Sequence, residues 1–299
     1  MSKKTLFGAS FDQSKKIVTE DILTEDGAGI GVLSSMSFWR KCLAFVVLAL
    51  VFIGYFIGIA FPEGMLNAPN EDIKIISQST AHLMGVIGIP MRPIIELFMY
   101  SFVALVFINF IPKLNYAHQL VYGWLTMIFF AIFGLFSVLP LATALTLGAF
   151  GSLAFILQVL IIIYFGTLKI RSTISNIKGQ LYHHKQPAKD WMTLLQTLIK
   201  KYGGFLLLLS ILNRWFFHFG DINKGGFELF SLIYGWIFLF FSIGYILMLQ
   251  FIIKHIVTVF YFFKYRNEYR TYFKIPNEIW YGKLRGKLKN KLKNKRRTK

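Results

Sequence analysis

Charged residues are absent from a long stretch in the middle of this 299-residue chain. Residues 114–168 contain no Asp, Glu, Lys or Arg over 55 positions, and Pro140 lies near the middle of them. The hydrocarbon core of a bilayer is ~30 Å thick and needs ~20 apolar helical residues to cross, so this stretch suffices for two crossings and a tight turn. An ordinary soluble domain is excluded, and a polytopic integral membrane protein is indicated.

Cysteine is nearly absent as well. The single Cys42 excludes an intrachain disulfide and any metal site built from several cysteines. Because Cys42 begins an apolar segment, we interpret it as a small hydrophobic residue, with a lipid-modified thiol as the alternative. His-Glu-x-x-His, Gly-x-Ser-x-Gly, P-loop and Cys-x-x-Cys signatures are also missing. We therefore expect no metal, no cofactor and no enzymatic activity.

Acidic residues are few, and basic residues are unevenly placed. The chain has 33 Lys and Arg against 14 Asp and Glu, and hydrophobic residues make up 55% of it. Charged residues account for 16%, below the ~25% of ordinary soluble domains. Fifteen of the basic residues lie between Lys254 and the C-terminus. The abundance of Phe, Ile, Lys and Asn is typical of an AT-rich genome and favours a bacterial origin.

Six segments are long enough to span a membrane as helices. They are residues 42–61, 94–111, 120–139, 149–168, 203–219 and 229–252. The N-terminal arm carries six Lys and Arg, the first three loops carry two, one and none, and the fourth loop carries seven. Cytoplasmic loops hold the Lys and Arg excess. The sequence therefore predicts an all-α, six-span transmembrane helix bundle in a cell membrane, with both termini in the cytoplasm.

Interfacial amphipathic helices are predicted in the cytoplasmic loop 169–202. The first continues the fourth span, because apolar residues recur at helical spacing: Ile170, Ile174, Ile177 and Leu181. A second helix is expected to start after Asp190 with Trp191 and to end near Lys200 and Lys201, where cations suit the helix dipole. Its apolar stripe is typical of a helix lying in the headgroup plane. Packing of that stripe on the protein's own spans is the alternative.

The two ends of the chain differ from the membrane domain, residues 42–256. The N-terminal arm, residues 1–41, contains an acidic cluster from Glu20 to Asp26 and is expected to be solvated. An intramolecular contact with the basic tail, or docking to a partner, is the alternative. The tail, residues 257–299, begins with an aromatic stretch typical of membrane interfaces and ends with a polybasic stretch.

Candidate lipid- or partner-binding residues lie in that tail and in the loop helix. Leu284, Leu288 and Leu292 form one narrow stripe on an otherwise basic helix. The candidates are Lys283, Arg285, Lys287, Lys289, Lys291, Lys293, Lys295, Arg296 and Arg297, with Trp191 and Trp280 as anchors. Juxtamembrane cations attract an anionic leaflet, so anionic lipid is the favoured partner and a protein partner is the second choice. Nucleic acid is disfavoured, although its phosphates would attract the same charges.

The second span carries the most unusual polar residues. Pro90 and Pro93 predict a break or kink before a clean span begins at residue 94. Arg92 and Glu96 are four residues apart and face one another if the helix is intact. Glu96 is the only acid inside a predicted span, and such a residue is a functional candidate by default. Pairing with Arg92 at the outer interface is the structural alternative.

Arg214 and His218 make the fifth predicted span the weakest of the six. We expect Arg214 to extend its charged head to the outer interface. With Asp221, Glu228 and His82, these side chains are candidates to line an outward vestibule.

Three functions are compatible with these features. The first is an accessory, assembly or immunity-type membrane component that binds protein partners or anionic lipid. The second is a small transporter or channel subunit whose pathway passes the broken second span. The third, with the least support, is a membrane enzyme acting on a lipid-linked substrate, with Glu96 or His218 as base.

Overall fold

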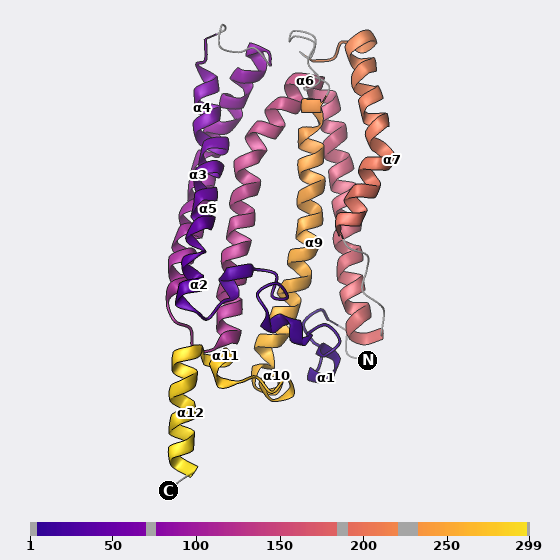
Figure 1. Ribbon diagram of the computed structural model, residues 1–299. Coiled ribbons are helices and arrows are strands. Elements are labelled where there is room, and N and C mark those ends of the chain that lie inside the picture. Colours follow the sequence, from indigo (N-terminus) through magenta and orange to yellow (C-terminus); the bar gives the residue numbers. More distant parts are fainter. Residues whose placement is uncertain (1–4, 70–75, 184–190, 221–232, 298–299) are drawn as a thin grey trace.

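The computed structural model describes residues 5–69, 76–183, 191–220 and 233–297, and every regular element in these ranges is helical (Figure 1). The elements are α1 (Phe11–Ser14), η1 (Glu20–Leu23), η2 (Gly31–Ser34), α2 (Phe38–Cys42), α3 (Phe45–Tyr55), η3 (Phe56–Ala60), α4 (Phe61–Leu66), α5 (Gln78–Phe110), α6 (Tyr116–His183), α7 (Trp191–Leu212), η5 (Asn213–Phe217), η6 (Tyr234–Trp236), α9 (Ile237–Lys264), α10 (Arg266–Tyr272), α11 (Asn277–Tyr281) and α12 (Lys283–Arg297). The predicted all-α class is confirmed for these residues.

Four helices of the described ranges are long and apolar enough to cross a membrane. They are Phe38–Leu66, Gln78–Phe110, Tyr116–His183 and Tyr234–Lys264. A membrane-embedded protein is therefore supported by length and composition. The helices run roughly parallel, and α6 ascends, turns at the upper end and descends again (Figure 1).

The turn of α6 lies at Gly151, where φ is 75° and ψ is 179°. A positive φ favours glycine because it has no Cβ to clash with the backbone. The predicted spans 120–139 and 149–168 placed this turn between residues 139 and 149, but it lies at Gly151, inside the second of those spans. Pro140 is buried inside the helix, and proline is tolerated in apolar helices whose neighbours satisfy the freed backbone groups.

The sequence predicted a break or kink at Pro90 and Pro93. Helix α5 is continuous from Gln78 to Phe110, so there is no break. Close packing against α4 accompanies this continuity. A Cβ added at Gly88 would lie 2.5 Å from the Cβ of Pro62, and one added at Gly85 would lie 2.6 Å from that of Leu66. Small residues thus allow the two helices to approach closely, as in membrane helix interfaces.

Helix α7 is likewise a single helix through Lys200 and Lys201, so the predicted short helix ending at those lysines is wrong. No proline or non-helical residue separates the two predicted pieces, and the apolar sequence after Lys201 simply extends the helix. By contrast, α6 extends to His183, so the residues after Leu168 are helical as expected.

Several helices are longer than a membrane is thick. Helix α5 has 33 residues and α9 has 28, which correspond to ~50 and ~42 Å at ~1.5 Å per residue. A hydrocarbon core of ~30 Å cannot cover them fully. The first charged residues of descending α6 and of α9 are Lys169 and Lys254, and both helices continue beyond them toward the lower end of the bundle (Figure 1).

A well-packed cap covers this lower end. We define the cap as residues 5–37, α10 and α11, together with the ends of α6 and α9 against which they pack. Its core residues come from distant parts of the sequence and are almost fully buried: Ala9, Val18, Ile22, Leu33, Trp124, Leu181, Tyr261, Phe262, Tyr269 and Trp280. The predicted solvated arm is therefore wrong, because its apolar residues complete this core.

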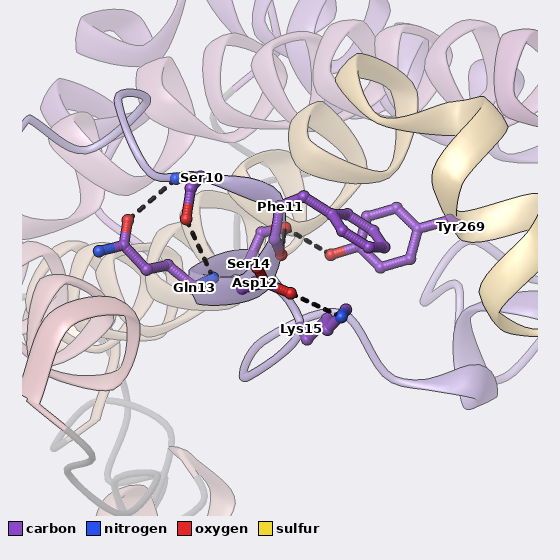
Figure 2. A network of polar contacts seen from close by, with 7 residues as sticks. All are labelled: Ser10, Phe11, Asp12, Gln13, Ser14, Lys15 and Tyr269. Carbon is purple, nitrogen blue, oxygen red and sulfur yellow. Dashed lines mark hydrogen bonds and ion pairs between the residues drawn. The ribbon is translucent and has the colours of Figure 1, made fainter.

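Helix α1 shows how the arm is fixed (Figure 2). Ser10 and Gln13 form a capping box, in which each side chain accepts from the other's backbone N–H. The hydroxyl groups of Ser14 and Tyr269 are hydrogen-bonded at 2.6 Å, and Phe11 meets the Tyr269 ring edge-to-face at 4.9 Å. Tyr269, an aromatic residue of the tail, is therefore part of the protein core and not of a membrane-interface belt.

Candidate functional site

Three groups of polar residues are candidates for function: an ion-pair cluster on α4 and α5, the basic helix α12, and a polar network beneath α5. The first lies in the upper part of the bundle. Arg92 donates to Glu96 on its own helix at 2.8 Å and to Glu63 on α4 at 2.6 Å. Sequence reasoning identified the Arg92–Glu96 pair but missed Glu63, which it placed in a loop.

The side chains of this cluster remain partly accessible. The exposed fractions are 44% for Arg92, 36% for Glu63 and 27% for Glu96. Arg92 lies 18 residues before the end of α5, or ~27 Å along the axis. That distance is close to one hydrocarbon thickness, so the cluster suits the outer interface if the lower end is cytoplasmic. Two carboxylates sharing one guanidinium also make a stable structural pair network.

Arg214 and His218 do not join this cluster. Arg214 belongs to η5 at the end of α7, and His218 is exposed with a left-handed φ of 53°. Helices α7 and α5 lie on opposite sides of the bundle, with α6 and α9 between them (Figure 1). The predicted vestibule is therefore not assembled from the described residues, and Asp221 and Glu228 lie outside those residues.

Helix α12 projects from the cap at the lower end (Figure 1). Its three leucines are exposed: 82% at Leu284, 61% at Leu288 and 61% at Leu292. The basic side chains described on it are also exposed: Lys283, Arg285, Lys287, Lys289, Lys291 and Lys295. The side chains of Lys293, Arg296 and Arg297 lie outside the described part, as does that of Trp191.

Trp280, predicted as a lipid anchor, is 2% exposed and belongs to the cap core. It packs against Phe262, and the guanidinium of Arg270 lies over its ring at 5.6 Å. A buried indole cannot insert into a lipid surface, so the anchor interpretation is wrong for this residue. Burial in the cap core, which the sequence alone did not reveal, takes precedence over the interfacial preference of tryptophan.

The root of α12 is fixed by polar contacts with α11. Asn290 accepts from Asn277 at 2.5 Å and donates to Glu278 at 2.7 Å. The ammonium of Lys289 lies 3.5 Å from the centroid of the Tyr281 ring. These contacts hold the leucine stripe away from the bundle, because they occupy the face of α12 that meets α11.

A buried polar network lies where α5 ends above the cap. Asn109 and Gln119 are 3% and 0% exposed, and both side chains donate to the carbonyl of Leu33 in the arm. Gln119 also donates to Asn109 Oδ1 at 2.7 Å. The network therefore ties the arm to the junction of α5 and α6. In the sequence, the signal for this network was Asn109, a polar residue within the predicted span 94–111.

Lys41 joins this network as a buried cation. It is 5% exposed, and its Nζ donates to the Asn109 carbonyl and to Gln119 Oε1, both at 2.8 Å. Lys113 is 8% exposed and donates to the Ile108 carbonyl at 2.6 Å. The last carbonyls of a helix lack intrahelical partners and carry partial negative charge, so both lysines stabilise the end of α5. Burial lowers the pKa of Lys113 below its ordinary value.

A cavity of about 900 Å³ opens beside these lysines, between the arm, the α5–α6 junction and the start of α12. Five cations line it: Arg40, Lys41, Lys113, Lys283 and Arg285. Three carboxylates also line it: Glu25, Asp26 and Glu278. Sequence reasoning counted Arg40 and Lys41 only as topology signals, because nothing in their spacing shows that they converge with residues 113 and 285.

Within the described residues, no group of three His, Cys, Asp or Glu side chains is placed to hold a metal ion. In comparisons with known proteins, no family model, no curated protein and no solved structure matches this chain.

Proposed function

We propose that this protein is a six-span component of a bacterial cell membrane with an accessory or assembly role and no catalytic activity. It engages anionic lipid or a protein partner through α12. Six passages follow if α6 counts as two, because it turns back at Gly151, and if α7 crosses beside its descending half (Figure 1). The transport alternative depended on a broken second span, and α5 is continuous there.

The proposed orientation places the cap and both termini in the cytoplasm. Lys169 and Lys254 begin the basic parts of α6 and α9, and each follows an apolar stretch of about one membrane thickness. The cap and α12 add most of the remaining cations at the same end (Figure 1). An excess of Lys and Arg on the cytoplasmic side is the general rule for multi-pass proteins, and it supports this orientation.

The observation that carries the proposed role is the exposure of the leucine stripe on α12. Three leucines at 61–82% exposure, flanked by lysines, form an apolar and basic surface that nothing in the described chain covers. Such a surface is stabilised by contact with an anionic membrane or with an acidic, apolar groove of a partner. The polar contacts with α11 orient α12 so that this surface stays exposed and does not pack onto the bundle.

Labelling of full-length protein tests the orientation. After replacing Cys42 with serine, single cysteines at Ser175 and Thr271 should resist an impermeant thiol reagent in intact cells. Cysteines at Ala68 and His218 should react. All four positions are described: Ser175, His218 and Thr271 are exposed, and Ala68 is partly exposed. Reaction at position 271 in intact cells would contradict six spans with a cytoplasmic tail.

An environment-sensitive fluorophore tests the role of α12. In the full chain, Cys42 is replaced by serine. The fluorophore is attached to a single cysteine either at position 288, within the leucine stripe, or at position 287, beside the stripe. In nanodiscs with anionic lipid, the emission at 288 should shift to the blue more than at 287. Added salt should reverse the shift, since it screens the attraction.

Equal emission at position 288 in neutral and anionic nanodiscs would contradict lipid binding. Purification from native membranes in mild detergent then tests the protein partner. A stoichiometric partner should co-purify with the natural chain and be lost when all three leucines are replaced by serine.

A further inference from the structure

The cavity beside Lys41 combines features that the proposed role of α12 does not use. It is lined by the arm, the α5–α6 junction and the segment from α11 to the first turn of α12, so its walls come from three separate regions of the chain. Arg40 is paired with Glu25 at 3.0 Å, which neutralises one cation of the lining. Lys41, Lys113, Lys283 and Arg285 remain against Asp26 and Glu278, so the lining stays positive.

Lys41 is the strongest sign that this lining accepts an anion. Its ammonium group has three donors, and the two acceptors found for it, a carbonyl and an amide, carry no formal charge. No carboxylate of the described residues lies within 4.0 Å of it. Lys113, a second cation, lines the same cavity. A cation that is 5% exposed and beside a second cation is stabilised when an anion occupies the adjacent space.

The rim of the cavity is apolar and faces outward. Phe38 and Trp39, from α2 at the start of the first candidate span, are 61% and 80% exposed. Leu284 of α12 completes the rim and is 82% exposed. Exposed aromatic residues at a span end are typical of the headgroup level of a bilayer. A ligand that enters past this rim meets apolar side chains first and cations afterwards.

We propose that this cavity binds the phosphate group of an anionic amphiphile of the glycerophospholipid class. The phosphate contacts Lys41, Lys113 and Arg285, and the apolar part lies along Phe38, Trp39 and Leu284. Arg285 already donates to the backbone carbonyl of Lys113 at 3.1 Å, which holds its guanidinium at the α5–α6 junction. Guanidinium and ammonium groups together form charge-assisted hydrogen bonds to phosphate oxygens. This inference is independent of the proposed function, because it needs no contact between the rest of α12 and a membrane.

The competing explanation is that the lysines only stabilise the end of α5. That role predicts a stability change when they are replaced but no stoichiometric ligand. A phosphate site predicts one bound lipid per chain. Because the apolar rim contacts only the apolar part of a lipid, a lipid should bind more tightly than a free phosphate ester.

The test uses full-length protein in neutral detergent, measured by native mass spectrometry and by thermal shift. The probes are a short-chain phosphatidylglycerol, the matching phosphatidylcholine and glycerol 3-phosphate. The variants are Lys41→Gln, which keeps a donor for the Asn109 carbonyl, and Arg285→Gln, which replaces an exposed side chain. Lys254→Gln removes the same charge from an exposed position of α9, outside both α12 and the cavity lining, and is the matched control.

Phosphatidylglycerol should bind at one per chain, and phosphatidylcholine should bind more weakly. Because a charge-assisted hydrogen bond is lost, Lys41→Gln and Arg285→Gln should each raise its Kd roughly 10- to 100-fold. Lys254→Gln should leave the Kd unchanged. Equal binding of glycerol 3-phosphate with the same variant pattern would support a phosphate site and assign its ligand as soluble. Binding that none of the cavity variants weakens, or no binding of either phosphate probe, would overturn the inference.

Discussion

The cap and the apolar helices use the same residue types in opposite ways. In the four candidate spans, only 17–33% of the most apolar window is buried inside the molecule, and Phe52 is 77% exposed. In the cap, Tyr261, Phe262 and Tyr269 are completely buried. Lipid tails are as apolar as these side chains, so exposure within a bilayer is not costly. Outside the bilayer the same exposure to water is unfavourable, and the aromatics form a core.

Hydrogen bonds also distinguish the cap from the apolar helices. Tyrosine hydroxyl groups in the cap reach backbone groups of the arm: Tyr261 donates to Leu6 and accepts from Ala9, both at 2.9 Å, and Tyr265 donates to the Ala9 carbonyl at 2.8 Å. These bonds join residues more than 250 positions apart along the sequence. The cap therefore closes the chain on itself, whereas the helices above it depend on lipid for part of their surroundings.

The largest expected effect comes from removing a cap aromatic. Tyr269→Ala should lower the free energy of unfolding by about 3–5 kcal/mol, because it opens a cavity in a fully packed core. Phe52→Ala is the matched control in the spans and should change it by no more than about 0.5 kcal/mol. Thermal unfolding of the two variants in detergent measures the difference. Equal effects would remove the proposed contrast between the regions.

A smaller effect is expected from a single hydroxyl group. Tyr261→Phe removes both bonds to the arm and leaves the Ala9 N–H buried without its partner, at a cost of about 1–3 kcal/mol. Tyr164→Phe, at a ring that is 70% exposed in α6, should have no measurable effect. Proteolysis of the arm should also become faster in Tyr261→Phe. An arm that stays as resistant as in the natural chain would contradict its attachment through this residue.

Alkaline pH should weaken the cap through Tyr269. Burial raises the pKa of its hydroxyl above the ordinary value near 10, although the hydrogen bond with Ser14 opposes the shift. A raised pKa in the folded state means that its stability contribution is complete below pH ~10 and is lost as the pH rises above that value. Tyr269→Phe cannot ionise, so its unfolding midpoint should fall less between pH 9 and 11. An identical fall of the unfolding midpoint in both proteins would contradict a contribution of Tyr269 ionisation to the alkaline loss of stability.

The smallest effect is expected at the ion pairs of Arg92. Glu96→Gln leaves Arg92 paired with Glu63, so abundance in the membrane should remain close to that of the natural chain. Replacing Glu63 and Glu96 together removes both partners and should lower abundance. If Glu96→Gln alone abolishes the phenotype that depends on the gene while abundance stays normal, Glu96 is functional as well as structural.

Local patterns in the sequence were sufficient to predict features that depend only on apolar character or on helix geometry. The charge-free stretch 114–168 predicted membrane helices, and the four-residue spacing predicted the Arg92–Glu96 pair, which is observed at 2.8 Å. Local rules failed where neighbours compensate. Pro90, Pro93 and Pro140 remain inside helices, because packing against α4 and other helices outweighs the lost backbone bonds.

The sequence by itself determined the helical class and the apolar character of the spans, since both depend on residue type and period. Only the tertiary structure decided that the arm is packed, that Trp280 is buried and that Lys41, Lys113 and Arg285 surround one cavity. These features join residues as far apart as Lys41 and Arg285. Contacts at such separations depend on how the ends of α5, α6 and α9 meet, and no local pattern in one sequence specifies that meeting.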